Sequence, residues 1–131
     1  MHKNKPDWTK LITPEMAEVV AHIRQWNEEH PATSTYLPDY MIEVEIEGPY
    51  GKIPCRLHYP RISDQPMGMM LYAHGGSLYL GNNDTHSRIM RTLTEKSDTV
   101  VIGVDYHLAP QNRFPKWIEE CVVATKYFRA Y

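Results

Sequence analysis

The sequence predicts an incomplete α/β fold, in which a helix and a β-hairpin precede a β-α-β-α segment of a mostly parallel sheet. Apolar and acidic residues alternate over 41–47, which is the period of a strand with one wet face. Two continuous apolar runs, 68–73 and 100–104, enclose a stretch with helical spacing. Parallel strands that are covered on both faces and joined by a crossover helix have this pattern.

The first predicted element is an amphipathic helix. Thr13-Pro14-Glu15 supplies an N-cap hydroxyl, a proline at the first helical position and an acid in the first turn. Apolar residues then recur on one face to about Asn27, namely Met16, Val19, Val20, Ile23 and Trp26.

A hairpin follows, with strands over 41–47 and 53–59 around the turn Gly48-Pro49-Tyr50-Gly51. One side of its second strand carries Ile53, Cys55, Leu57 and Tyr59. After the strand 68–73, a helix is expected over 85–96, with Ile89, Met90 and Leu93 facing inward. A strand over 99–106 and a helix opened by Phe114-Pro115 complete the pattern; the apolar residues of that helix are Trp117, Ile118, Cys121, Val122 and Ala124.

Composition narrows the class of protein. The 131 residues are 42% hydrophobic and 23% charged with a formal net charge of −2, so they form a globular chain without the basic stripe that nucleic acid requires. The longest apolar run falls short of the roughly 18 residues of a membrane span. No secretory signal is evident, so we expect a cytoplasmic protein in which Cys55 and Cys121 are reduced thiols. No cofactor is expected.

The most informative segment is 69–77, where an apolar strand stops at His74-Gly75-Gly76-Ser77. Acyl transfer needs preorganised N–H donors for the oxyanion that develops on the attacked carbonyl. Glycine lets backbone come close to a reacting group, so this turn fits that need. Glycine turns after strands also bind phosphate or merely reverse the chain, and the turn alone leaves those alternatives open.

The order of several motifs resembles the hormone-sensitive-lipase-like branch of the α/β-hydrolases, and its bacterial acetyl esterases in particular. In that family an apolar strand runs into His-Gly-Gly-Gly, followed about thirty residues later by Asp-Tyr-Arg-Leu-Ala-Pro-Glu and then by Phe-Pro before an acidic pair. Here these motifs read His74-Gly75-Gly76-Ser77, Asp105-Tyr106-His107-Leu108-Ala109-Pro110-Gln111, Phe114-Pro115 and Glu119-Glu120. The resemblance is clear from about Gly68 to Phe128 and faint in the N-terminal helix.

The resemblance implies an incomplete α/β-hydrolase fold in a single partial domain, with a cap-like segment over 1–40 and the first half of the catalytic core over 41–131. It implies that the N–H groups of Gly76 and Ser77 line an oxyanion hole, with Gly75 shaping the turn. The supporting residues would be His74, Asp105 and Tyr106, and no metal is called for.

The resemblance also implies a serine nucleophile, which this chain lacks. No Gly-Xaa-Ser-Xaa-Gly occurs in the 131 residues, and the family's Ser, Asp and His triad lies downstream. We therefore expect a carboxylic-ester hydrolase for small-molecule esters that is represented by its oxyanion-hole half and is inactive alone.

Three departures from the family pattern matter. Ser77 replaces the last glycine, so a positive φ there would cost more. His107 replaces arginine and Gln111 replaces glutamate, so a buried pair of the family is expected to be altered or absent. The third departure is the missing remainder.

Other readings stay open. The chain could be a non-catalytic truncated module that forms a homo-oligomer through the exposed edge of strand 68–73. A phosphate or nucleotide site is weak because the motif spacings are absent. His74 as a base and Asp105 as a triad acid are less favoured than supports of the loop. Zinc on His58, His74, His86 and His107 is disfavoured because no pair has compact ligand spacing.

Overall fold

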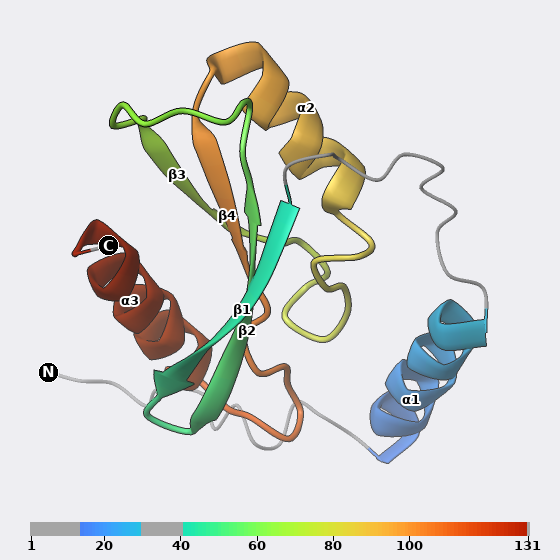
Figure 1. Cartoon of the computed structure of the whole chain (residues 1–131). Coiled ribbons are helices and arrows are strands. Elements are labelled where there is room, and N and C mark those ends of the chain that lie inside the picture. Colours follow the sequence, from blue (N-terminus) through green and yellow to red (C-terminus); the bar gives the residue numbers. More distant parts are fainter. Residues whose placement is uncertain (1–13, 30–40, 131) are drawn as a thin grey trace, which may run out of the picture.

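The computed structural model describes residues 14–29 and 41–130 (Figure 1). The elements follow the predicted order of a helix, a hairpin and a β-α-β-α segment, which confirms the fold class. They are α1 (Pro14–Glu29), β1 (Met41–Gly48), β2 (Gly51–His58), β3 (Met69–Ala73), α2 (Ser87–Ser97), β4 (Val100–Val104) and α3 (Lys116–Arg129). The expected N-cap Thr13 and the side chains of Met16 and Trp26 lie outside the described residues.

The four strands form one mixed sheet in the order β1-β2-β4-β3. β1 pairs antiparallel with β2, from Met41 opposite His58 to Gly48 opposite Gly51. β2 pairs antiparallel with β4, and β3 pairs parallel with β4, as the two apolar runs predict. Helices α2 and α3 cover opposite faces of this sheet (Figure 1).

The hydrophobic core lies between the sheet and α3. Its strand residues alternate, as a half-buried face requires. They include Ile53, Cys55 and Leu57 of β2, which the sequence places on one side, and Val100, Ile102 and Val104 of β4. Ala124 and Phe128 of α3 close the cluster.

The buried face of α2 differs from the sequence prediction. α2 buries Ser87, Met90 and Thr94, while Ile89 is 50% exposed, so its predicted inward position is wrong. The cause is the small surface at Gly103 of β4: a Cβ there would lie 2.5 Å from Met90 Sδ. Close contact at this point fixes which face of α2 turns inward.

β3 also differs from its prediction. The sequence treats it as covered on both faces, yet Met69 is 42% and Met70 37% exposed, because β3 is an edge strand. For β4 the same prediction is confirmed, since all five of its residues are buried. In the part of the chain that the structure describes, no helix combines the length and apolarity needed to cross a membrane.

Candidate functional site

The chain reverses sharply where β3 ends. Gly76 has a φ of +131°, and Ser77 and Leu78 follow in the left-handed region at 55° and 67°. The Gly76 carbonyl accepts hydrogen bonds from the N–H groups of Tyr79 and Leu80, both at 3.0 Å. A Cβ on Gly76 would lie 2.0 Å from the Leu80 carbonyl oxygen, so no other residue fits. Ser77 thus adopts a positive φ, a conformation that costs a serine more than the glycine it replaces.

The amides at this turn are available to a ligand. Within the described ranges 14–29 and 41–130, the N–H groups of Gly75, Gly76 and Ser77 donate no hydrogen bond to another backbone group. A Cβ on Gly75 would make only ordinary contact, since the nearest atom would be His86 Nε2 at 3.7 Å. A turn with unengaged donors can hold an anionic oxygen.

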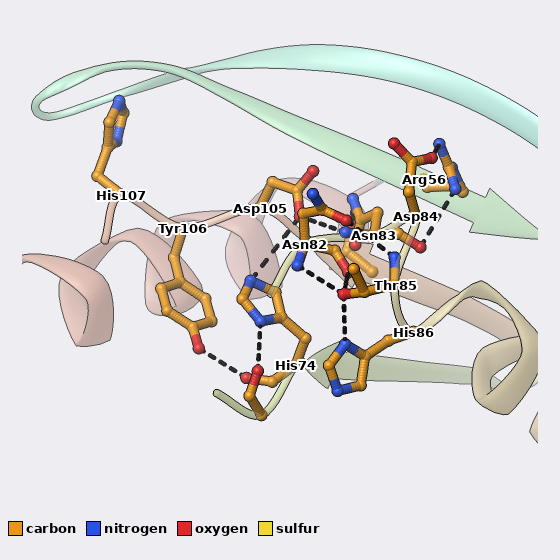
Figure 2. A network of polar contacts seen from close by, with 12 residues as sticks. Arg56, His74, Asn82, Asn83, Asp84, Thr85, His86, Asp105, Tyr106 and His107 are labelled. Atoms are coloured by element: carbon orange, nitrogen blue, oxygen red, sulfur yellow. Dashed lines mark hydrogen bonds and ion pairs between the residues drawn. The ribbon is translucent and has the colours of Figure 1, made fainter. Parts of the chain in front are cut away.

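Two of the expected supporting residues fix the start of the turn (Figure 2). The Tyr106 hydroxyl donates to the His74 carbonyl at 2.6 Å, and the two rings stack at 4.5 Å and 10°. His74 Nδ1 lies 2.9 Å from the Gly75 carbonyl oxygen. Burial lowers the pKa of His74, which keeps the ring neutral at physiological pH. This geometry favours a ring that holds the turn over one that acts as a base.

Asp105 holds the loop that precedes α2. Its Oδ1 accepts the Asn83 N–H at 2.6 Å and lies 3.8 Å from His74 Nε2. Arg56 binds the same loop, since its Nη1 donates to the Asn83 carbonyl at 3.2 Å and its Nη2 to Asp84 at 2.5 Å (Figure 2). The loop before α2 is therefore tied to both β2 and the end of β4.

The segment before α2 is also held by hydrogen bonds between Asn82 and Thr85. The Thr85 N–H donates to Asn82 Oδ1 at 2.9 Å, and the Asn82 N–H donates to Thr85 Oγ1 at 3.0 Å. Side chains of this kind compete for backbone groups and favour loops and caps. Among the described residues, no group of three or more His, Cys, Asp and Glu is placed to hold a metal ion.

The ionisation of Asp105 gives a pH-dependent prediction. Burial raises its pKa from 3.8 to about 6, against the Asn83 hydrogen bond and Arg56. The folded protein therefore binds this proton more tightly than the unfolded chain, and stability falls as pH rises from about 4 to 6. At neutral pH the ionised group costs up to about 3 kcal/mol.

Asp105→Asn should raise the free energy of unfolding by about 1–3 kcal/mol at pH 7.5, because the amide oxygen still accepts the Asn83 N–H. The gain should vanish near pH 4, as urea titrations at both pH values would show. His58, whose pKa burial lowers to about 4, has the opposite pH dependence but is common to both proteins. An equal loss of stability at both pH values would contradict this account.

Sequence reasoning missed two residues at the site. Glu120 is 0% exposed; it accepts the His107 N–H at 2.8 Å and also contacts His107 Nδ1. The replacements at positions 107 and 111 were expected to alter or remove a buried pair; in the structure His107 contacts Glu120, and Gln111 accepts a hydrogen bond from Arg24. Glu120 shares its face of α3 with Ala124 and Phe128, which was the available signal.

The second missed residue is Arg24 of α1. Its guanidinium donates to the carbonyls of Tyr79 and Ala109 and to the side chain of Gln111. The acceptors lie 55 to 87 residues away in sequence, so no local pattern could indicate them.

A hollow of about 420 Å³ lies beside the turn on the α3 face of the sheet. Its lining is mainly apolar and consists of Ala73, His74, Leu78, Tyr106, Trp117, Ile118, Cys121, Val122 and Thr125. Gly75, Gly76 and Ser77 are not part of that lining.

Comparison with known proteins identifies relatives. Residues 70–131 match a family model described as alpha/beta hydrolase fold. An acetyl esterase of Salmonella schwarzengrund is 41% identical over 105 residues, which are 80% of this chain and 30% of that protein, and the acetyl esterase of Salmonella typhi matches to the same extent. The chain thus spans about a third of the length of the curated relatives it matches.

Solved structures agree in fold. The thermophilic carboxylesterase EstE1 from a metagenomic library has 31% identity and a TM-score of 0.73, covering 85% of this chain and 37% of its own. A hyperthermophilic esterase from Pyrobaculum calidifontis has 28% identity and a TM-score of 0.76, covering 94% of this chain and 41% of its own.

Proposed function

Since this chain belongs to the α/β-hydrolase fold family, with acetyl esterases among its relatives, we propose that it is the oxyanion-hole half of a carboxylic-ester hydrolase for short acyl esters. The observation that supports this most is the turn after β3, where the amides of Gly75, Gly76 and Ser77 are not used by other backbone groups of the described chain. A donor placed where charge develops in the transition state is worth about 10²–10³ in rate.

In this proposal the N–H groups of Gly76 and Ser77 donate to the carbonyl oxygen of the ester as it becomes an oxyanion. Gly75 leaves the approach open. Tyr106 and His74 keep the turn in place, because the Tyr106 hydroxyl holds the His74 carbonyl. Asp105 fixes the neighbouring loop through Asn83.

The serine nucleophile and its acid and base belong to residues outside 1–131 in this proposal. A serine attacks the ester, a histidine moves the proton, and the turn binds the tetrahedral adduct. The 131 residues hold no Gly-Xaa-Ser-Xaa-Gly. Alone, the chain should neither turn over p-nitrophenyl acetate nor be labelled stoichiometrically by a serine-directed phosphonate.

A chimera tests the function. Residues 1–131 are fused to the part of the Salmonella acetyl esterase that follows the aligned region, and hydrolysis of p-nitrophenyl acetate is measured. We expect turnover, and we expect Ser77→Pro to lower kcat by about 10²-fold or more, because it removes one N–H donor and because the proline ring cannot adopt the φ of 55° found at this position. A folded chimera that is inactive, or one that is unaffected by Ser77→Pro, would count against the proposal.

A second candidate function, a self-associating module, is favoured by one observation. β3 is an edge strand with Met69 and Met70 exposed, and no charged residue interrupts it. Unpaired edges of this kind template pairing with another chain. In this alternative two copies join through residues 68–73.

Met70→Lys tests the alternative because charge on an edge strand opposes pairing. Size-exclusion chromatography with light scattering should show a dimer or larger species for the parent chain and a shift to monomer for the variant. Lys52→Met, on the other side of the sheet, serves as the control. A parent chain that is monomeric at about 100 μM would rule out edge pairing of useful strength.

A further inference from the structure

We propose that Arg24 is a positioning residue through which α1 fixes the shape of the turn that carries the Gly76 and Ser77 amides. All three nitrogen atoms of its guanidinium donate hydrogen bonds. Nε and Nη2 donate to the Tyr79 carbonyl at 3.0 and 2.8 Å, Nη2 also to the Ala109 carbonyl at 2.6 Å, and Nη1 to Gln111 Oε1 at 3.1 Å. The importance of the turn for chemistry rests on the function proposed above.

Tyr79 is a member of the turn itself. Its N–H donates to the Gly76 carbonyl, while its own carbonyl accepts two donors of Arg24. The residue is therefore held on both sides of its backbone. Hydrogen bonds from a charged donor are about twice as strong as neutral ones.

The loop that follows β4 is also bound by Arg24. The Ala109 N–H donates to the Leu78 carbonyl at 2.9 Å, and the Ala109 carbonyl accepts from Arg24. Arg24 thus lies at the junction of the two loops and joins both to α1. A lysine has no planar fork and cannot reach three separated acceptors in this way.

The attachment of α1 to the sheet domain also involves Arg24. Figure 1 shows α1 apart from the sheet, and its apolar residues Val19 and Ile23 are exposed. Among the residues with described side chains, the hydrogen bonds between α1 and the sheet domain all come from Arg24. Among the described side chains, Arg24 therefore couples the position of α1 to the state of the turn.

The turn needs support from its surroundings. Ser77 and Leu78 are consecutive non-glycine residues with positive φ. Such a backbone persists only where its surroundings hold it. Arg24 supplies part of that support from outside the loop, so release of α1 should relax the turn, and by reciprocity a ligand on the turn should tighten α1.

Amide hydrogen exchange of the full chain, read by NMR, tests the coupling. We expect the Tyr79 and Leu80 amides to exchange at least about tenfold faster in Arg24→Ala, with the amides of β4 unchanged. Arg24→Lys should show an intermediate increase, and Gln111→Glu, which gives the guanidinium an ionic partner, should slow the exchange. Arg88→Ala, an exposed arginine on α2, is the control and should exchange as the parent does.

Rates in Arg24→Ala within twofold of the parent would overturn the inference. Should that variant unfold, Arg24→Lys and Gln111→Glu still decide it, because unchanged rates in both would refute the coupling.

A second readout separates positioning from mere structure. Titration with methylphosphonate, which resembles a tetrahedral adduct, should shift the Gly76 and Ser77 amide signals of the parent, with an affinity at least about fivefold weaker in Arg24→Ala. Partial recovery of that affinity in Arg24→Lys is expected, and an affinity unchanged by Arg24→Ala would refute positioning. If methylphosphonate leaves the parent unaffected, the proposed function fails, while the exchange rates still decide the role of Arg24.

Discussion

Replacing Gly76 by alanine should destroy the turn after β3 and destabilise the chain by about 2–4 kcal/mol. The new Cβ would lie 2.0 Å from the Leu80 carbonyl oxygen, which is backbone and cannot rotate away. The φ of +131° is also one that L-residues rarely adopt. The loss can be measured by urea unfolding, and by the disappearance of protection at the Tyr79 and Leu80 amides.

Gly75→Ala is the matched control, one residue away in the same motif. A Cβ on Gly75 would meet only His86 Nε2 at 3.7 Å, which is ordinary contact. The free energy of unfolding of this variant should lie within about 1 kcal/mol of that of the parent. Equal effects of the two substitutions would mean that the geometry of the turn is not the one described.

Removing the partner of Glu120 should have the next largest effect. His107→Ala removes the contact of His107 Nδ1 with a carboxyl group that is 0% exposed, and it keeps the backbone N–H that donates to the same carboxyl group. Stranding one member of a buried pair costs about 3–5 kcal/mol, and the retained N–H and the partial exposure of His107 bring our expectation to about 2–3 kcal/mol. Urea unfolding at pH 7 measures the difference.

His107→Arg is the informative companion, because arginine stands at this position in the resembling family. A guanidinium can donate to the same carboxyl group, so this variant should keep most of the stability that His107→Ala loses. Tyr50→Phe, which removes an exposed contact to Glu119, should change stability by less than about 0.5 kcal/mol. A neutral His107→Ala would show that the pair contributes nothing to the fold.

The sequence determined those features that depend on short-range pattern. Five apolar residues in a row predicted the fully buried β4, and alternation predicted the buried side of β2. The position of the glycine turn after β3 was also predictable, because the apolar run ends at His74-Gly75-Gly76.

Features that depend on residues distant in sequence could not be predicted from the sequence alone. The exposed edge of strand 68–73 was expected, but the exposure of the Met69 and Met70 side chains was not, because the apolar run indicated a strand covered on both faces. The left-handed backbone of Leu78 runs against the preference of its residue type. Support for it comes from contacts such as Arg24 to Tyr79, which span 55 residues.

Stability and the candidate site oppose one another at several points. Ser77 and Leu78 hold unfavourable backbone conformations, and burial disfavours the ionised form of Asp105. Such local costs concentrate where a chain holds groups for chemistry. They are offset by the buried strands of the core and by Tyr106, whose hydroxyl holds the start of the turn.

The most direct test of the central claim follows the amide signals of the full chain during a titration with methylphosphonate. The account predicts saturable downfield shifts of the Gly76 and Ser77 N–H protons, because both would donate to a phosphonate oxygen, and little change in the amides of β4. Loss of these shifts in Gly76→Ala, with retention in Gly75→Ala, would complete the expected result. Shifts confined to other residues, or none at millimolar concentrations, would contradict the assignment of the turn as an oxyanion site.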